Sequence, residues 1–281
     1  MATDRLTIMP MRIDLHTHTL ASDGRLSASA LIQRAVAKGV EMLSITDHDT
    51  VAAYAEINGA AVPLTLIPGI EFSTAWQHTG IHVLGLNVDL NNAALLEGIT
   101  RQQSARHQRA EHIAGRLAQH GIDDALEGAR RIAGNGNIGR PHFAEYLVAS
   151  GAARSINHAF DKFLKSDSCN SIKYWATLPQ IISWIRAAGG LAILAHPLKY
   201  KFTRTKLSAL LDDFMEAGGH GLEVISGKQN AQDTSALAKI CVQRQLFASC
   251  GSDFHQPDLH WAEVGNFQPL PEDCRPVWDH F

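Results

Sequence analysis

A recurring succession of an amphipathic stretch, a glycine and a short apolar run organises the chain. Leu31 to Gly39 precedes VEMLSITDHD, WIRAAGG precedes LAILAHP, and FMEAGG precedes HGLEVIS. Glycine commonly follows a helix C-terminus, where the backbone turns left-handed, and each apolar run has the length of a buried parallel strand. Repeated helix–strand units predict an α/β sheet or barrel.

Four more apolar runs have strand length: Arg12–His16, Leu64–Phe72, Ile81–Leu86 and Leu246–Asp253. About seven short strands in such a chain favour a closed barrel. From residue 91 to about residue 178 the pattern is helical instead, and Ala93–His120 is the longest predicted helix. We therefore expect a barrel domain formed by residues 1–90 and 179–281, with residues 91–178 as an inserted helical subdomain too long to be a plain loop.

The composition, 45% hydrophobic and 19% charged over 281 residues, is typical of a folded globular protein. The chain has no apolar run of membrane-spanning length and no signal-peptide pattern at its start, so we expect a cytoplasmic protein with no membrane partner. A net charge of −3 argues against a global attraction to duplex DNA, and no protein partner is evident. The scattered Cys169, Cys241, Cys250 and Cys274 form no CxxC, which predicts reduced thiols.

Histidine is unusually abundant, with 15 copies, and several lie at predicted strand ends. His16 and His18 are two residues apart at the end of the first strand, so their side chains share a face, and Asp253 and His255 repeat this spacing at the end of the last strand. Further histidines and carboxylates lie at or near other strand ends: Asp23, His48, Glu71, His82 and His196. Because α/β barrels build active sites at the carboxyl ends of their strands, these residues predict one joint metal site.

Seven motifs follow one another between Arg12 and about Gly265: DLHTHTLASDG, ITDHDT, PGIEFST, IHVLGL, GRPHFA, LAILAHP and GSDFH. In this order they resemble the PHP (polymerase and histidinol phosphatase) family of metal-dependent phosphoesterases, within the amidohydrolase superfamily. Within the family the chain is similar to the small stand-alone group that includes the nucleotide-bisphosphate phosphatases and the related exoribonuclease. The resemblance implies a distorted (β/α)7 barrel with a trinuclear metal centre.

The resemblance also implies a ligand set for three divalent metals. The first metal would be held by His16, His18, Glu71 and Asp253, the second by Glu71, His82 and His196, and the third by Asp23, His48 and His255. Six imidazoles with three carboxylates and no thiolate suit Mn, Fe or Zn better than Mg or Ca, and we expect Mn. Three nearby carboxylates are expected to orient imidazoles or to cap the backbone rather than to ligate: Asp14, Asp47 and Asp49.

The predicted chemistry is hydrolysis of a phosphate ester by a hydroxide that bridges two metals, in line with the leaving group. Glu71 and Asp253 are the predicted catalytic residues because they would hold the bridged metals, and no general acid is assigned. The chain lacks the GxSxG, P-loop and GxGxxG patterns, which argues against a serine hydrolase, an NTPase and a dinucleotide-binding enzyme.

Substrate contacts are predicted in two loops. The glycine- and asparagine-rich AGNGNIG runs into the helix that starts GRPH, where Asn135 and Arg140 would bind phosphate. The hairpin FSTAWQHTG between two predicted ligands would lie at the mouth of the site. There Ser73 would contact phosphate, and Trp76 or His78 would stack on a base or reach a sugar. Lys173 and Lys228 are weaker phosphate candidates. The arginines of the insert, Arg101, Arg106, Arg109, Arg116, Arg130 and Arg131, indicate a solvated helix face, with an RNA track as the alternative.

The predicted function is removal of the 3′-phosphate from nucleoside 3′,5′-bisphosphates. A 5′-to-3′ exoribonuclease acting on short 5′-phosphorylated RNA is the main alternative, because both reactions break a P–O bond beside a second phosphate. Histidinol phosphate phosphatase is a third option, although no pocket for an imidazole and an amine is evident. Two alternatives belong to other functional classes: an enzyme that hydrolyses a C–N bond, and a metal-binding module without enzymatic activity.

Overall fold

Eight strands of this computed structural model, which describes residues 11–57, 61–165 and 172–281, form one sheet. The strands lie in the sheet in sequence order: β1 (Ile13–Asp14), β2 (Met42–Ile45), β3 (Thr65–Trp76), β4 (Thr79–Leu86), β5 (Leu191–Leu194), β6 (Gly221–Ser226), β7 (Phe247–Gly251) and β8 (Arg275–Pro276). The predicted mixed α/β fold is confirmed, and the last short strand was not predicted.

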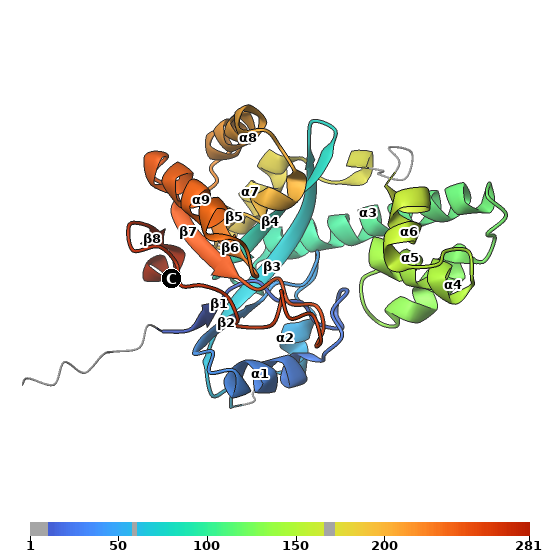
Figure 1. The fold of residues 1–281 in the computed structure, drawn as a ribbon, viewed down its shortest axis with the longest axis horizontal. Helices are drawn as coiled ribbons and strands as arrows, with labels where there is room; N and C mark the ends of the chain where they lie inside the picture. Colours follow the sequence, from blue (N-terminus) through green and yellow to red (C-terminus); the bar gives the residue numbers. More distant parts are fainter. Residues whose placement is uncertain (1–10, 58–60, 166–171) are drawn as a thin grey trace, which may run out of the picture.

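The sheet is curled and mostly parallel, as Figure 1 shows. Only β4 runs antiparallel to its neighbours, β3 and β5, because a tight turn at Gln77 and His78 folds the chain back into a long hairpin. On the other side β1 lies beside β7, where the Leu15 N–H donates to the Cys250 carbonyl at 3.1 Å. The curl therefore brings the carboxyl end of β1 beside β7.

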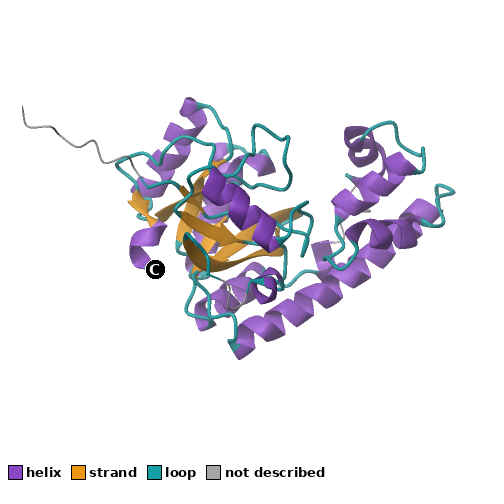
Figure 2. Cartoon of the chain, turned by 90° about the horizontal axis from the view of Figure 1, so that it is seen from below, coloured by secondary structure: helices purple, strands orange, loops and turns teal. Residues whose placement is uncertain are grey.

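Helices surround the sheet: α1 (Ala28–Ala37), α2 (Ala53–Glu56), α7 (Leu178–Ala187), α8 (Arg204–Glu216) and α9 (Ala231–Gln243) (Figure 2). The glycines predicted to end three of them have left-handed backbones, with φ of 74° at Gly39, 73° at Gly189 and 94° at Gly218. Only glycine adopts this conformation without steric cost, which explains why the helix–glycine–strand pattern was informative.

The segment between β4 and α7 is helical, as predicted: α3 (Ala93–Ala118), α4 (Ala125–Ala133), α5 (Arg140–Ala149), α6 (Ile156–Ala159), the π-helical η1 (Phe160–Leu164) and the 3₁₀ helix η3 (Ile172–Tyr174). Helices α4 to α6 lie at the end of α3 that is remote from the sheet (Figures 1 and 2). They form an apolar cluster with Ile113 and Leu117 of α3, whereas Leu95 and Ile99 at the start of α3 belong to the core beside the sheet. The change from one core to the other thus occurs within α3.

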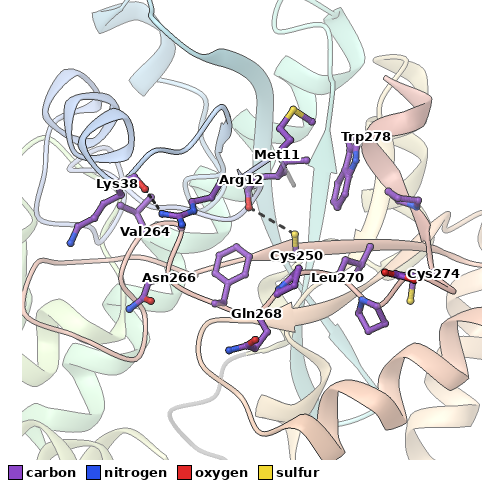
Figure 3. A pocket seen from close by; sticks show the side chains of 17 residues that line it. Met11, Arg12, Lys38, Cys250, Val264, Asn266, Gln268, Leu270, Cys274 and Trp278 are labelled. Atoms are coloured by element: carbon purple, nitrogen blue, oxygen red, sulfur yellow. Dashed lines mark hydrogen bonds between the residues drawn. The ribbon is translucent and has the colours of Figure 1, made fainter. Parts of the chain in front are cut away.

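The C-terminal residues pack beside β1 and β7 and border a cavity of about 540 Å³ (Figure 3). Its walls include Arg12, Cys250, Cys274 and Trp278, and none of the predicted metal ligands lines it. Cys241, Cys250 and Cys274 are buried free thiols, whereas Cys169 lies outside the described residues. No helix in the described ranges is both long and apolar enough to cross a membrane.

Candidate metal centre

The nine predicted ligands converge from six strands. Four parallel strands deliver most of them just beyond their carboxyl ends: β1 delivers His16, His18 and Asp23, β2 delivers His48, β5 delivers His196, and β7 delivers Asp253 and His255. Glu71 and His82 lie within β3 and β4, whose antiparallel pairing sets Ser73 opposite His82 and so brings Glu71 close to it. The curl of the sheet therefore joins residues that are far apart in the sequence.

The Glu71 carboxylate lies at the centre of the cluster and is fully buried. Its Oε1 is 2.9 Å from His82 Nδ1 and 3.0 Å from His196 Nε2. Its Oε2 is 2.9 Å from His48 Nδ1, and the Nε2 atoms of His16 and His18 lie 3.4 and 3.3 Å from it. One carboxylate thus faces five imidazoles, which is the arrangement expected of a bridging ligand.

The other two carboxylates flank this centre. Asp253 Oδ1 lies 3.4 Å from His16 Nε2 and 3.2 Å from His18 Nε2. Asp23 faces the other side of the cluster, with Oδ1 3.3 Å from His255 Nε2 and Oδ2 3.8 Å from His48 Nε2. Asp253 therefore contacts the imidazoles of His16 and His18, and Asp23 contacts those of His48 and His255.

The residues present fit a group of divalent cations. Their ligand atoms form four overlapping sets, each within 4.8 Å: His18, Asp23, His48 and His255; His16, His18 and Glu71; His16, His196 and Asp253; and His48, Glu71 and His82. Six predicted ligands each contribute a buried nitrogen or oxygen that makes no hydrogen bond: His16, His18, Asp23, His48, Glu71 and His196. Buried polar atoms are nearly always paired, and bound cations would satisfy this set.

The pKa shifts of two imidazoles and of the central carboxylate suit metal binding. Burial lowers the pKa of His82 to about 4, and burial together with His255 and His48 lowers that of His18. Burial alone would raise the pKa of Glu71, but His48 and the other imidazoles hold it well below its usual range. Neutral imidazoles around an ionised carboxylate are the forms that coordinate metal ions. His16 is the exception: burial would lower its pKa, but Glu223 and Glu71 raise it to about 10, so this ring must lose a proton to coordinate.

Comparison with known proteins decides the family. Residues 14–195 match the family model of the PHP domain. The chain belongs to the PHP domain family. The resemblance inferred from the motifs is therefore confirmed.

Relatives of this PHP domain protein cover nearly its whole length. The 5′-3′ exoribonuclease Rnm of Escherichia coli is 43% identical over 270 residues, covering 94% of this chain and 92% of the relative. The 3′,5′-nucleoside bisphosphate phosphatase of Chromobacterium violaceum is 37% identical over 270 residues, covering 95% of each chain. A solved structure of an amidohydrolase from Chromobacterium violaceum, with bound sulfate and no metal, has a TM-score of 0.86 at 36% identity and covers 96% of this chain and 95% of its own.

Glu223 is a residue beside the candidate centre that the sequence analysis missed. It is fully buried on β6, where its Oε1 lies 2.9 Å from His16 Nδ1 and its Oε2 accepts from the His196 N–H at 2.5 Å. Carboxylates in this position fix the ring orientation and tautomer of a metal-binding histidine. The available signal was the acid inside the otherwise apolar run HGLEVIS.

Asp14 and Asp47, by contrast, accept mainly from backbone N–H and hydroxyl groups of the loops around the centre. Asp14 accepts from the N–H groups of Ser252 at 2.9 Å and Gly265 at 2.8 Å. Asp47 accepts from the N–H of Thr19 at 2.7 Å and from the hydroxyl groups of Thr19 and Ser22. Both carboxylates fix the loops that carry ligands, which is one of the two roles expected for them.

The third such acid, Asp49, pairs with helix α3. Its Oδ2 accepts from Arg106 Nε at 2.6 Å, and its Oδ1 accepts from the Gln102 side chain at 3.1 Å and from the Ser73 N–H at 2.7 Å. Arg106 also donates to the Ser73 hydroxyl at 2.9 Å and is only 6% exposed. The predicted solvated position of Arg106 is therefore wrong, because its guanidinium pairs with Asp49 and docks α3 beside His48. Ser73, predicted to bind phosphate, is buried within the same network.

The hairpin residues also differ from the prediction. Trp76 is 6% exposed, packs against Phe202 with ring centroids 5.8 Å apart, and donates its indole N–H to Asp213 at 2.6 Å. A stacking role for Trp76 does not fit this burial, because the alternation along β3 turns its ring toward the core. His78 is exposed at the hairpin turn.

The glycine-rich loop reaches the centre through Asn137, whose side-chain amide donates to the His48 carbonyl at 2.8 Å. The predicted Asn135 is exposed, and Arg140 is the partly exposed first residue of α5. Lys173 is exposed with its ammonium 5.2 Å from the centre of the Tyr174 ring, and Lys228 is exposed at a separate cavity that Asn266 also lines. The structure does not bring these last two lysines into the ligand cluster.

Proposed function

We propose that this PHP domain protein is a metal-dependent phosphoesterase that removes the 3′-phosphate of nucleoside 3′,5′-bisphosphates. The observation that carries the proposal is the buried cluster of six histidines and three acids with unpaired ligand atoms. The relative from Chromobacterium violaceum that bears this activity in its name covers almost the whole chain, which supports the choice of substrate.

The proposed centre holds three divalent metals, preferably Mn, within a distorted (β/α)7 barrel carrying residues 91–178 as an inserted subdomain. His16, His18, Glu71 and Asp253 would hold one ion, Glu71, His82 and His196 a second, and Asp23, His48 and His255 a third. Metals in such a centre supply a nucleophile from water at neutral pH and neutralise charge on the phosphoryl group.

The chain's own residues prepare this chemistry. Glu71 and Asp253 fix the spacing of the ligand sets, and Glu223 holds the His16 ring so that Nε2 faces the centre. Most of the ligands are buried, but the side chains of His82 and His255 are 28% and 29% exposed. These two imidazoles mark the open side of the cluster, where a phosphate ester would enter.

Exoribonuclease activity on short 5′-phosphorylated RNA is the second candidate, and one feature favours it. A cavity of about 210 Å³ lies between α3 and the glycine-rich loop, and Arg106, His107 and Arg130 are among its lining residues. Asn137, which also lines it, contacts the His48 carbonyl. A cationic hollow so close to the centre would suit the backbone of a longer substrate.

The test is phosphate release and product identity by mass spectrometry. Mn-loaded protein would be given adenosine 3′,5′-bisphosphate, AMP and a 5′-phosphorylated short RNA in parallel. We expect AMP from the bisphosphate and loss of activity in Glu71→Gln, whereas the exposed control Glu216→Gln keeps it. Stepwise release of 5′ nucleotides from RNA would favour the second candidate, and inactivity toward all three substrates would refute both.

A further inference from the structure

The turn that follows β5 is fixed at both ends. It is the 3₁₀ helix η4 (Pro197–Tyr200), and its first anchor is the hydrogen bond from the His196 N–H to Glu223. At the other end the Tyr200 hydroxyl accepts from the His82 N–H at 3.0 Å and donates to the Ala195 carbonyl at 2.8 Å. The turn is thereby attached to β4, β5 and β6.

Two residues with left-handed backbones flank η4. His196 has a φ of 26° and Lys201 a φ of 53°. Such conformations are unfavourable for residues other than glycine and persist where the surroundings impose them, often at functional sites. Since the turn is both anchored and strained, the backbone position of Lys199 within it is set by the fold.

Lys199 lies against the metal centre. Its ammonium forms an ion pair with Asp253 Oδ2, while the other oxygen of this carboxylate, Oδ1, faces His16 and His18. The Lys199 side chain is nevertheless 54% exposed, whereas the side chains of Glu71 and Glu223 are fully buried. Lys199 is therefore placed where the cluster meets solvent.

The ammonium group has donors left for a substrate. It carries three N–H donors, and a single carboxylate oxygen uses one. An anionic oxygen bound at the centre would lie beside Asp253, within reach of the remaining donors. A role limited to neutralising Asp253 would not require an exposed side chain on an anchored turn.

We propose that Lys199 is a substrate-binding residue whose ammonium donates to an oxygen of the phosphate held at the metal centre. The proposal rests on the phosphoesterase function proposed above and adds a contact at the rim of its site. The contact is charge-assisted, and for a half-exposed group we expect its loss to weaken phosphate binding roughly tenfold.

The experiment compares wild type, Lys199→Met, Lys199→Arg and the matched control Lys201→Met at saturating Mn. Lys201 follows two residues later and is also exposed. Its charge interacts with Asp161, which belongs to the proposed inserted subdomain. Isothermal titration calorimetry would measure the binding of inorganic phosphate, steady-state kinetics would give kcat and KM for the bisphosphate, and elemental analysis would count metals per chain.

The expected result is a roughly tenfold rise in the phosphate Kd and in KM for Lys199→Met, with the metal count unchanged, partial recovery in Lys199→Arg and no change in Lys201→Met. Unchanged phosphate binding in folded, metal-loaded Lys199→Met would overturn the proposal. Loss of metal without loss of phosphate affinity at saturating Mn would also overturn it, since Lys199 would then only support Asp253. If wild type hydrolyses no phosphoester, the proposed function fails, and calorimetry still decides whether Lys199 binds phosphate.

Discussion

Replacing Glu223 with Gln should weaken metal binding although Glu223 is not a predicted ligand. The carboxylate serves two groups at once, the His16 ring at 2.9 Å and the His196 N–H at 2.5 Å. An amide has one acceptor oxygen and one donor nitrogen, so it can satisfy only one of them. If its NH₂ faces His16, the ring must carry its proton on Nε2, the atom that faces Glu71 and Asp253.

The size of the effect follows from these two contacts. Loss of a carboxylate that orients a metal-binding histidine typically costs 10- to 100-fold in metal affinity, or about 1.4–2.7 kcal/mol. In the other amide orientation, two donors oppose each other at His196, and leaving such a buried group unpaired costs about 1–3 kcal/mol of folding free energy. We therefore expect Glu223→Gln to lose affinity for Mn, folding stability, or both.

Competition with a chelator, read out as Mn per chain, would measure the affinity, and urea unfolding of the metal-free protein would measure the stability. The proton balance adds a separate readout. Although burial would lower the pKa of His16, Glu223 and Glu71 raise it to about 10, so Mn binding to wild type should release a proton from this ring near neutral pH. Fewer protons should be released by Glu223→Gln. Wild-type values for affinity, stability and proton release in this variant would refute the assigned role of Glu223.

Three further substitutions test other contacts. Arg106→Met leaves the buried Asp49 without its cation and should lower the free energy of unfolding in urea by about 3–5 kcal/mol. Adding Asp49→Asn in the same chain should restore part of this loss. Equal stabilities of the single and double variants would contradict the pairing. Tyr54→Phe removes a buried hydroxyl that accepts from the Gly69 N–H at 2.7 Å, so unfolding should become easier by about 1–3 kcal/mol with little change in kcat. Glu263→Gln should cost about 0.5–1 kcal/mol at pH 7. The hydrogen bond from Arg34 lowers the pKa of Glu263 below 4.5, so this difference in unfolding free energy should shrink as the pH falls below 4.5, and a difference that grows in acid would contradict the assignment.

The sequence allowed the strand ends to be predicted because the signals there are local. The left-handed glycines Gly39 and Gly189 end helices within a few residues of the strands that carry His48 and His196. Spacing of two residues along extended backbone was enough to pair His16 with His18. Once the strands are known to share a sheet, their carboxyl ends must meet, so the convergence of the candidate ligands followed without knowledge of individual contacts.

Contacts between distant segments could not be predicted in this way. Glu223 lies 207 residues from His16, and nothing in its neighbourhood specifies that partner. The arginines of α3 were expected on a solvated helix face, yet Arg106 is buried because its guanidinium binds Asp49.

Helix α3 and the candidate centre are joined by the network around Asp49. This residue follows His48 directly, binds Arg106 of α3, and lies beside Asn137 of the loop that leads into α5. Any shift of α3 relative to the sheet would therefore act on the strand end that carries His48. The same helix borders the cationic cavity, so the segment that would contact a longer substrate also helps to position a candidate ligand. Because of this connection, Arg106→Met should alter activity on RNA and on the bisphosphate together, whereas a substitution of the exposed Arg130 should affect RNA alone.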